Sequence, residues 1–288
     1  MRRRQFLAAA VVAAAAGCSS RPTASAGPAP ASPSAATAAG LTPTAAAETG
    51  PEGRPGTPQE ILQRSTVPVL CYHQVREQTA ADSAGARPLI CPPGVLEGHL
   101  RALTEAGMQP VTSSQLVDHL ELGTALPDKP VMLSFDDASG GQYTNALPIL
   151  RQLGMPATFF VMTVVLDRPN WLSRDDVRAL DAAGMTIASH TWDHHPVTKY
   201  GDKEWATQLV KPREQLEEIV GHDVDLFAYP YGLWNAAALP HVQAAGYRAA
   251  FQLTGQPPDP QRPLLTIRRV LVPSSWDNHT MLTRLRPP

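Results

Sequence analysis

The sequence predicts an α/β fold in which a single domain forms a (β/α) barrel around a parallel sheet. From residue 67 onward, short apolar runs rich in Val, Ile and Phe alternate with segments of helical spacing, a pattern typical of parallel strands joined by helices. The runs at 130–135 and 157–162 are almost unbroken, as expected of strands covered on both faces. An open doubly wound sheet is the alternative, but no glycine-rich phosphate loop in the sequence supports a nucleotide site there.

The predicted elements begin with a strand at 67–72, which is rich in valine. The first helix, 94–106, carries apolar side chains at helical spacing and ends before Gly107. Apolar runs predict the other strands at 109–112, 130–135, 157–162, 186–189, 226–229, 249–252 and 267–272. Helical spacing predicts connecting helices at 114–122, 142–153, 174–183, 203–220 and 235–245.

Length and composition indicate one folded domain, which we assign to residues 59–288. Of the 288 residues 43% are apolar, which suffices for one sizeable core but hardly for two. The formal charge is −2, from 24 basic and 26 acidic residues; without the three arginines at 2–4 the balance becomes 21 against 26, or −5. Nucleic acid is not an expected partner, because phosphate binding needs a clustered positive surface. The sequence indicates no protein partner.

Residues 1–17 have the features of an export signal peptide. Three arginines precede an apolar run at 6–16, which is too short to span a hydrocarbon core of about 30 Å. The segment 3–7 resembles the twin-arginine export motif, and Ala-Ala-Gly before Cys18 resembles a bacterial lipobox, whose first position is usually Leu. This resemblance implies a lipid on Cys18 and an extracytoplasmic protein anchored to the outer face of the cytoplasmic membrane. The alternative is an uncleaved helical anchor with an incidental cysteine.

Residues 18–58 are predicted to comprise the lipidated cysteine and a disordered tether. The segment 19–58 has no aromatic residue and consists mostly of Ala, Pro, Ser, Thr and Gly. It cannot bury enough apolar area to offset the loss of chain entropy. We therefore expect a semi-extended spacer between the membrane and the folded domain.

Cys71 and Cys91 are the two cysteines of the predicted folded domain. Outside the cytoplasm, such a pair could form a disulfide. A separation of twenty positions does not establish one, and two buried thiols are the alternative. The sequence leaves both states open.

Groups suited to catalysis follow the predicted strands at their carboxyl ends, where the reactive residues of (β/α) barrels lie. Asp136 and Asp137 are adjacent carboxylates, which repel each other unless a cation lies beside them. His190 and His194 are four residues apart and would face the same way in a helical turn. Two histidines and one carboxylate form the three-ligand set of a catalytic zinc with an open position for water. A third strand end carries a stiff aromatic turn at 229–232.

These motifs resemble the first three motifs of the NodB-type polysaccharide deacetylases, carbohydrate esterase family 4, and the resemblance covers most of 67–272. The motifs are Ser-Phe-Asp-Asp at 134–137, His-Thr-Trp-Asp-His at 190–194 and Tyr-Pro-Tyr-Gly at 229–232. Val-Leu-Cys-Tyr-His at 69–73 and Leu-Pro-Asp-Lys-Pro at 126–130 are most similar to the branch that contains the poly-β-1,6-N-acetylglucosamine deacetylases. In that branch the motif order is circularly permuted and a catalytic histidine comes first. The resemblance implies a distorted (β/α) barrel of the NodB type.

The resemblance also implies a metal-dependent hydrolase with one divalent ion. Carried over residue by residue, it makes Asp137, His190 and His194 the metal ligands. It makes Asp136 the general base, which takes a proton as water attacks an acetamide carbonyl. Zn²⁺ is the expected ion, although Co²⁺, Ni²⁺ or Mn²⁺ could occupy the same ligand set.

Two further residues receive roles from the same resemblance. His73 becomes the general acid that protonates the leaving amine, a task that suits a histidine near neutral pH. Tyr231 lends its backbone N–H to the oxyanion. Trp192 and Tyr231 adjoin the metal motifs, and we expect their rings to bind the sugar, although core packing is the commoner fate of tryptophan.

The sequence departs from the family pattern in three places. The glycine that usually follows the two aspartates is Ala138, so the turn lacks free access to positive φ. The arginine that usually orients the base is Ala228, and either Arg268 or Arg269 could replace it. The later Asp-Trp motif is not evident, although Trp-Asp at 276–277 is similar in kind.

The expected reaction is removal of N-acetyl groups from a β-linked N-acetylglucosamine-containing polysaccharide at the cell envelope. The sequence does not identify that polysaccharide. One alternative is an esterase that removes O-acetyl groups from xylan or another glycan with the same site. A second is a catalytically silent glycan-binding lipoprotein, which the missing arginine makes conceivable.

Overall fold

The computed structural model describes residues 54–253 and 255–285. The predicted export signal, Cys18 and nearly all of the predicted tether lie outside the described residues. Helix α1 (Pro58–Arg64) begins at the last residue of that tether, because Thr57 caps it. The Thr57 hydroxyl accepts from the Glu60 backbone N–H, and the Glu60 carboxylate accepts from that of Thr57. Within the described part, no helix combines the length and the apolar character needed to cross a bilayer.

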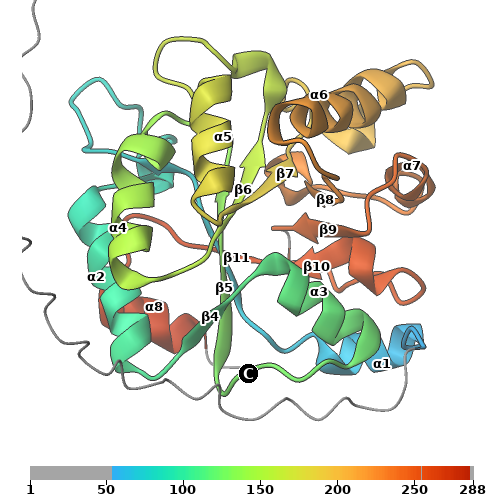
Figure 1. The fold of residues 1–288 in the computed structure, drawn as a ribbon, viewed down its shortest axis with the longest axis horizontal. Coiled ribbons are helices and arrows are strands. Elements are labelled where there is room, and N and C mark those ends of the chain that lie inside the picture. The colour runs from blue at the N-terminus through green and yellow to red at the C-terminus, as the bar shows by residue number, and fades with distance from the viewer. Residues whose placement is uncertain (1–53, 254, 286–288) are drawn as a thin grey trace, which may run out of the picture. The chain divides into compact units, whose positions relative to one another are not determined.

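A nearly closed ring of parallel strands forms the centre of the domain (Figure 1). The ring follows the order β1 (Val69–Tyr72), β5 (Pro130–Asp136), β6 (Thr158–Val161), β7 (Thr186–Ser189), β8 (Leu226–Ala228), β9 (Ala249–Gln252) and β10 (Ile267–Arg268). The next strand, β11 (Val270–Leu271), pairs with β1, so the last segment of the sheet contacts β9 through β10 and β1 through β11 and nearly closes the ring. Outside it, β4 (Gln109–Val111) pairs with the first half of β5. The predicted barrel is confirmed, and the open doubly wound alternative is wrong.

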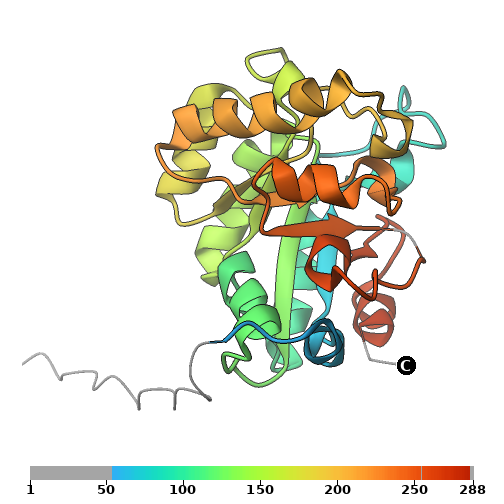
Figure 2. The same ribbon diagram turned by 90° about the vertical axis from the view of Figure 1, so that its right-hand side faces the viewer.

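Helices surround this ring on several sides. They are α2 (Pro93–Glu105), α3 (Ser113–Leu122), α4 (Leu147–Leu153), α5 (Arg174–Ala182), α6 (Lys211–Val220), α7 (Leu239–Ala244) and α8 (Asn278–Arg284). In Figure 1, α2, α4 and α8 lie on one side of the sheet and α6 and α7 on the other. Figure 2 shows α6 and α7 from the front, with α1 and α3 toward the lower end of the barrel.

Side chains along the strands alternate between the barrel interior and the surrounding helices. Apolar side chains from seven strands of the ring and from β4 form one cluster with those of α1 and α3, so the ring strands fill the interior and the two helices close one end. The interior members from the strands are Val69, Met132, Phe160, Ala188, Leu226, Ala228, Ala249, Phe251 and Ile267. Further along β1 and β5, the alternation brings Cys71, His73, Ser134 and Asp136 to the same side. The interior therefore becomes polar toward the carboxyl ends of the strands.

The structure differs from the predicted elements mainly at their ends. The helices predicted at 142–153 and 203–220 begin as π-helical turns, η2 (Gln142–Ala146) and η5 (Ala206–Val210). The helix predicted at 235–245 is limited to α7, and the last predicted strand is interrupted at Arg269. The paired strands β2 (Gln74–Val75) and β3 (Ile90–Cys91), together with α1 and α8, were not predicted. Elements this short leave little periodicity in a sequence.

Candidate active site

The backbone at the carboxyl ends of three strands takes up an unusual conformation. Positive φ occurs at Asp137 (78°), Ala138 (69°), Thr191 (68°), His194 (66°) and Tyr231 (58°). Each such non-glycine residue costs on the order of 1–2 kcal/mol, and clusters of them are typical of functional sites. Ala138 thus adopts positive φ although it is not a glycine. The turn after Asp136 and Asp137 is therefore formed despite the Ala in place of the usual Gly.

The three predicted metal ligands lie together. Asp137 Oδ1 is 3.4 Å from His190 Nε2 and 3.5 Å from His194 Nε2, and the ligand atoms of all three lie within 4.8 Å of one another. His190 Nδ1–H donates to the Ala228 carbonyl oxygen at 2.8 Å. Because a carbonyl can only accept, Nδ1 carries the proton of the neutral ring, and the lone pair of that form is on Nε2, which faces Asp137.

The chemistry of this group fits a divalent cation. Asp137 Oδ1 is buried and has no hydrogen-bond partner among the described residues, an arrangement that needs a ligand or an ion to satisfy it. Two imidazole nitrogens and one carboxylate oxygen form a common set of protein ligands for a catalytic metal. Metal binding by Asp137, His190 and His194 stays a prediction, which this geometry supports.

The two histidines titrate differently in the absence of an ion. Burial and the neighbouring His190 lower the pKa of His194 to about 4, so its lone pair is free at neutral pH. Burial alone would lower the pKa of His190, but the carboxylates of Asp136 and Asp137 more than offset it, and the net shift is upward. A bound cation would oppose that protonation, because it competes with the proton for Nε2.

Asp136, the predicted base, is held by Arg269. The two terminal nitrogens of Arg269 donate to the two carboxylate oxygens of Asp136 at 2.6 and 2.7 Å, and both side chains are almost fully buried. The Arg269 guanidinium also lies over the Phe160 ring, 5.0 Å from its centroid. Burial would raise the pKa of Asp136, but the positive charge of Arg269 outweighs it and holds that pKa well below its usual range. Asp136 is therefore ionised and fixed in orientation.

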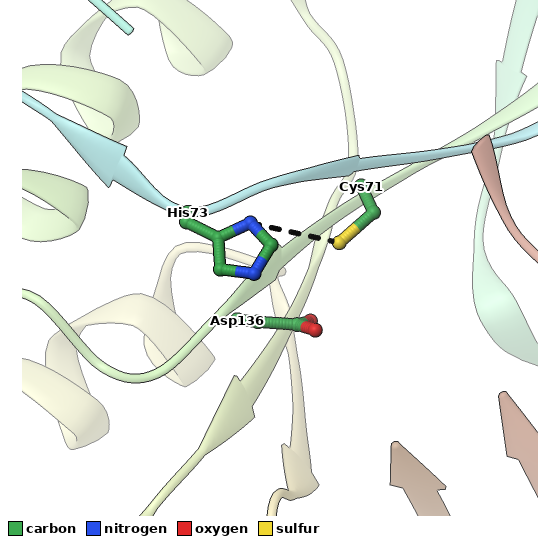
Figure 3. Close-up of side chains that lie close together, drawn as sticks. All are labelled: Cys71, His73 and Asp136. Carbon is green, nitrogen blue, oxygen red and sulfur yellow. Dashed lines mark hydrogen bonds between the residues drawn. The ribbon is translucent and has the colours of Figure 1, made fainter. Parts of the chain in front are cut away.

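His73, the predicted acid, lies just after β1 and faces Asp136 (Figure 3). Gln142 holds the two strand ends together, because its Nε2 donates to the His73 and Asp136 carbonyl oxygens at 3.0 and 2.5 Å. Cys71 Sγ lies 3.9 Å from His73 Nδ1. Burial raises the pKa of the Cys71 thiol well above its usual range.

Two aromatic side chains stand at the rim of the site. Tyr231 is 61% exposed and Trp192 is 40% exposed, whereas most large apolar side chains of the described part are buried. The Tyr231 ring contacts the ring of His194 edge-on, with 4.4 Å between centroids. Gln208 Oε1 accepts from the Trp192 backbone N–H at 3.3 Å. The position of both rings suits the predicted contact with a sugar, which stays a prediction.

Other sequence candidates have structural roles in the described part. Asp277 caps α8, and the Trp276 carbonyl contacts His99, so this pair does not form the missing Asp-Trp motif. Cys71 and Cys91 are both free, buried thiols, so of the two states that the sequence left open the disulfide is absent from the described residues. The ring of His195 packs against Tyr200.

Arg269, Gln142 and Cys71 are parts of the site that the sequence alone did not assign. Arg268 and Arg269 were equal candidates to orient the base; Arg268 is exposed, and Arg269 points into the barrel. Alternation of inward and outward side chains along the last strand distinguishes Arg268 from Arg269 only once the interruption of that strand at Arg269 is known. Gln142 and Cys71 carry no signal in one sequence, because their roles depend on the pairing of β1 with β5.

Comparisons with known proteins find polysaccharide deacetylases among those similar to this chain. A family model described as polysaccharide deacetylase matches residues 123–250. The poly-beta-1,6-N-acetyl-D-glucosamine N-deacetylase of Staphylococcus aureus (strain MRSA252) is 27% identical over 167 residues, covering 53% of this chain and 58% of that protein. Protein YxkH of Bacillus subtilis (strain 168) is 23% identical over 182 residues, covering 63% and 62%. The chain thus spans about 60% of the length of the curated relatives it matches.

Solved structures share the fold over a larger part of the chain. The Streptococcus pyogenes deacetylase PplD in complex with acetate matches 77% of this chain and 98% of its own, with a TM-score of 0.70 and 21% identity. IcaB from Ammonifex degensii matches 74% of this chain and 95% of its own, with a TM-score of 0.63 and 26% identity.

Proposed function

Since this chain contains a polysaccharide deacetylase domain of the NodB type, carbohydrate esterase family 4, we propose that it is a metal-dependent polysaccharide N-deacetylase. The expected substrate is a β-linked N-acetylglucosamine-containing polysaccharide of the cell envelope. The observation that carries this proposal is the convergence of Asp137, His190 and His194 beside an ionised Asp136. Relatives named as poly-beta-1,6-N-acetyl-D-glucosamine N-deacetylases support the class of substrate.

The residues of the site supply the parts that amide hydrolysis needs. A divalent ion held by Asp137, His190 and His194 supplies Lewis acidity, which polarises a carbonyl and acidifies water. Asp136 accepts the proton that water loses on attack. Its low pKa keeps it ionised over the working pH range, and Arg269 fixes the direction of its two oxygens. The backbone N–H of Tyr231 is assigned to the oxyanion.

The leaving amine must gain a proton as the carbon–nitrogen bond breaks. His73 is the assigned donor, because its ring lies beside Asp136 (Figure 3) and is not one of the two imidazoles assigned to the metal. Its carbonyl is fixed by Gln142 at 3.0 Å. The base and the acid therefore come from neighbouring parallel strands, β5 and β1, whose pairing sets their separation.

We propose the anchoring from the sequence alone. The lipobox-like segment supports a lipid on Cys18 and a place on the outer face of the cytoplasmic membrane. Zn²⁺ is the proposed ion, since two histidines and a carboxylate suit it, and Co²⁺, Ni²⁺ and Mn²⁺ are the ions to compare with it.

The test is acetate release by the purified full-length protein, with and without a chelator. The substrates are β-1,4- and β-1,6-linked N-acetylglucosamine oligomers and acetylated xylan. We expect acetate from the N-acetylglucosamine oligomers, loss of that activity with chelator and its return with added metal. Acetate from xylan alone would favour the O-acetyl esterase. Retention of oligomers without acetate release would favour the silent glycan-binding lipoprotein.

A further inference from the structure

A second group of metal-ligand atoms lies beside the proposed catalytic site. Ligand atoms of Cys71, His73 and Asp136 all lie within 4.8 Å of one another. Figure 3 shows the three side chains together. Cys71 Sγ and His73 Nδ1 are in hydrogen-bond contact, 3.9 Å apart. The exposed fractions are 0% for Cys71, 9% for His73 and 1% for Asp136. None of the roles assigned above uses the thiol.

The strands, rather than a loop, set this arrangement. Cys71 pairs with Ser134 where β1 runs beside β5, and two residues further along both strands the alternation brings His73 and Asp136 to the same side. Bond lengths of about 2.3 Å to sulfur and about 2.0 Å to nitrogen place two ligands of one zinc ion roughly 3.5–3.9 Å apart. The observed separation of Cys71 Sγ and His73 Nδ1 lies in this range.

The charges around the group decide which ions it could hold. Each Asp136 oxygen accepts one N–H from Arg269 and retains lone-pair capacity for another partner. The guanidinium and an ion at the first site both repel a second cation, so a hard ion such as Mg²⁺ gains too little here. A thiolate ligand favours softer ions and offsets part of that repulsion.

We propose that Cys71, His73 and Asp136 form a second, weaker site for a thiophilic divalent cation such as Zn²⁺ or Cd²⁺, and that its occupation inhibits the enzyme. On binding, the Cys71 S–H bond breaks, a sulfur–metal bond forms and the proton leaves to solvent. His73 binds as the neutral imidazole through Nδ1, and no electron is transferred. Inhibition follows because the ion occupies the assigned acid and base together. Only this inhibition rests on the proposed function; the binding does not.

Cobalt titration of the metal-free full-length protein tests the site. Thiolate–Co²⁺ ligation gives a charge-transfer band in the near ultraviolet, whereas the Asp137, His190 and His194 set has no sulfur. All proteins carry Cys18→Ala, which leaves Cys71 and Cys91 as the thiols of the chain. Cys71→Ser is the test variant. Cys91→Ser is its matched control, because Cys91 is also a buried free thiol, with 2% of its surface exposed.

We expect two bound Co²⁺ ions per chain in the Cys18→Ala protein, with the thiolate band growing only with the second. Cys71→Ser should lose the band and the second ion, and Cys91→Ser should keep both. A protein without the band, or a band that survives Cys71→Ser, would overturn the proposal. Should Cys71→Ser not fold, cobalt X-ray absorption of the Cys18→Ala protein decides: a sulfur neighbour must occur above one equivalent and not below it.

Zinc dependence of acetate release tests the inhibition separately. Activity should rise with the first equivalent of Zn²⁺ and fall at higher concentration, and Cys71→Ser should move the falling limb at least about tenfold higher. An unchanged falling limb would contradict the inhibition while leaving the cobalt result intact. Absence of acetate release at every Zn²⁺ concentration would count against the proposed function, and the cobalt spectrum would still report on the second site.

Discussion

Arg269 holds Asp136 through two hydrogen bonds from the segment that closes the barrel, where β10 ends and β11 begins. The family pattern places an arginine near the third motif instead, at a position that is Ala228 here. Ala228 belongs to the interior cluster, and the Arg269 guanidinium lies over Phe160 of the same cluster, so the last strand supplies a guanidinium to the barrel interior where the third motif has none. The argument for a silent glycan-binding protein, which depended on a missing arginine, is weakened accordingly.

Replacement of Arg269 by lysine should lower kcat more than it changes KM. Lysine keeps a positive charge but cannot donate to both Asp136 oxygens in one plane, so the base loses its fixed direction. We expect a loss of about 10- to 100-fold in kcat, in line with a misplaced catalytic group, with metal content retained. Arg268→Lys is the matched control: Arg268 is the exposed neighbour of Arg269, and this variant should behave as wild type. Equal kinetics for the two variants would show that Arg269 does not position the base.

Replacement of Asp136 by asparagine should abolish acetate release and leave the metal in place. Asparagine has nearly the same shape but cannot accept the proton from water, and general-base catalysis contributes on the order of 10²–10⁴-fold. Acetate assay and metal analysis on the same preparation check this prediction. Loss of the ion assigned to Asp137, His190 and His194, together with activity, would make Asp136 a ligand of that first site and exchange the roles of the two aspartates.

His190→Ala and His194→Ala should each remove most of the bound metal. Either change leaves two ligands where the proposed ion needs three. His195→Ala is the matched control, because the ring of His195 packs against Tyr200 and its side chain is not among the grouped ligand atoms. Metal content measured after dialysis against trace chelator decides the matter. Wild-type metal content in both ligand variants would remove the assignment.

The barrel and the first-site residues could be predicted from sequence because each depends on a local pattern. Asp136, Asp137 and His190 directly follow runs whose apolar character marks them as strands, and His194 lies one helical spacing beyond His190. Arg269 could not be assigned, since its inward direction depends on the interruption between β10 and β11. The Cys71 contact depends on the register of β1 against β5, which pairs residues more than sixty positions apart. Local sequence patterns predict individual helices and strands, whereas contacts between residues of distant strands can be assigned only when the pairing of the strands is known.

The ion pair between His222 and Asp181 should make a small, pH-dependent contribution to stability. His222 Nε2 lies 2.8 Å from Asp181 Oδ1, and this hydrogen bond raises the pKa of His222 above its usual range. Because the pKa of His222 is higher in the folded than in the unfolded protein, the pair stabilises the fold fully below the unfolded pKa of about 6.5. This stabilisation is lost as pH rises through the folded pKa. Because His222 is half exposed, we expect less than about 1 kcal/mol.

Urea unfolding of wild type and His222→Gln checks the sign. The variant should be less stable at pH 5.5 and nearly equal to wild type at pH 9, and high salt should reduce the difference. Asp181→Asn should lose the same increment, and the double variant should lose no more than either single one. A larger difference at high pH than at low pH would contradict the pairing.

Gly232 and Gly221 form a matched pair that separates backbone strain from crowding. Both have positive φ, 67° at Gly232 and 80° at Gly221, so alanine at either position costs on the order of 1 kcal/mol in backbone strain. A Cβ at Gly232 would meet the Leu253 backbone nitrogen at 2.1 Å, whereas one at Gly221 would have no heavy atom within 4 Å. Gly232→Ala should therefore lower the free energy of unfolding clearly more than Gly221→Ala does.

Because Gly232 follows Tyr231 in the turn at the rim, Gly232→Ala should also reduce acetate release, and Gly221→Ala should not. Equal unfolding free energies for the two variants would mean that the turn can move away from Leu253, and Tyr231 would then not be held by this close approach.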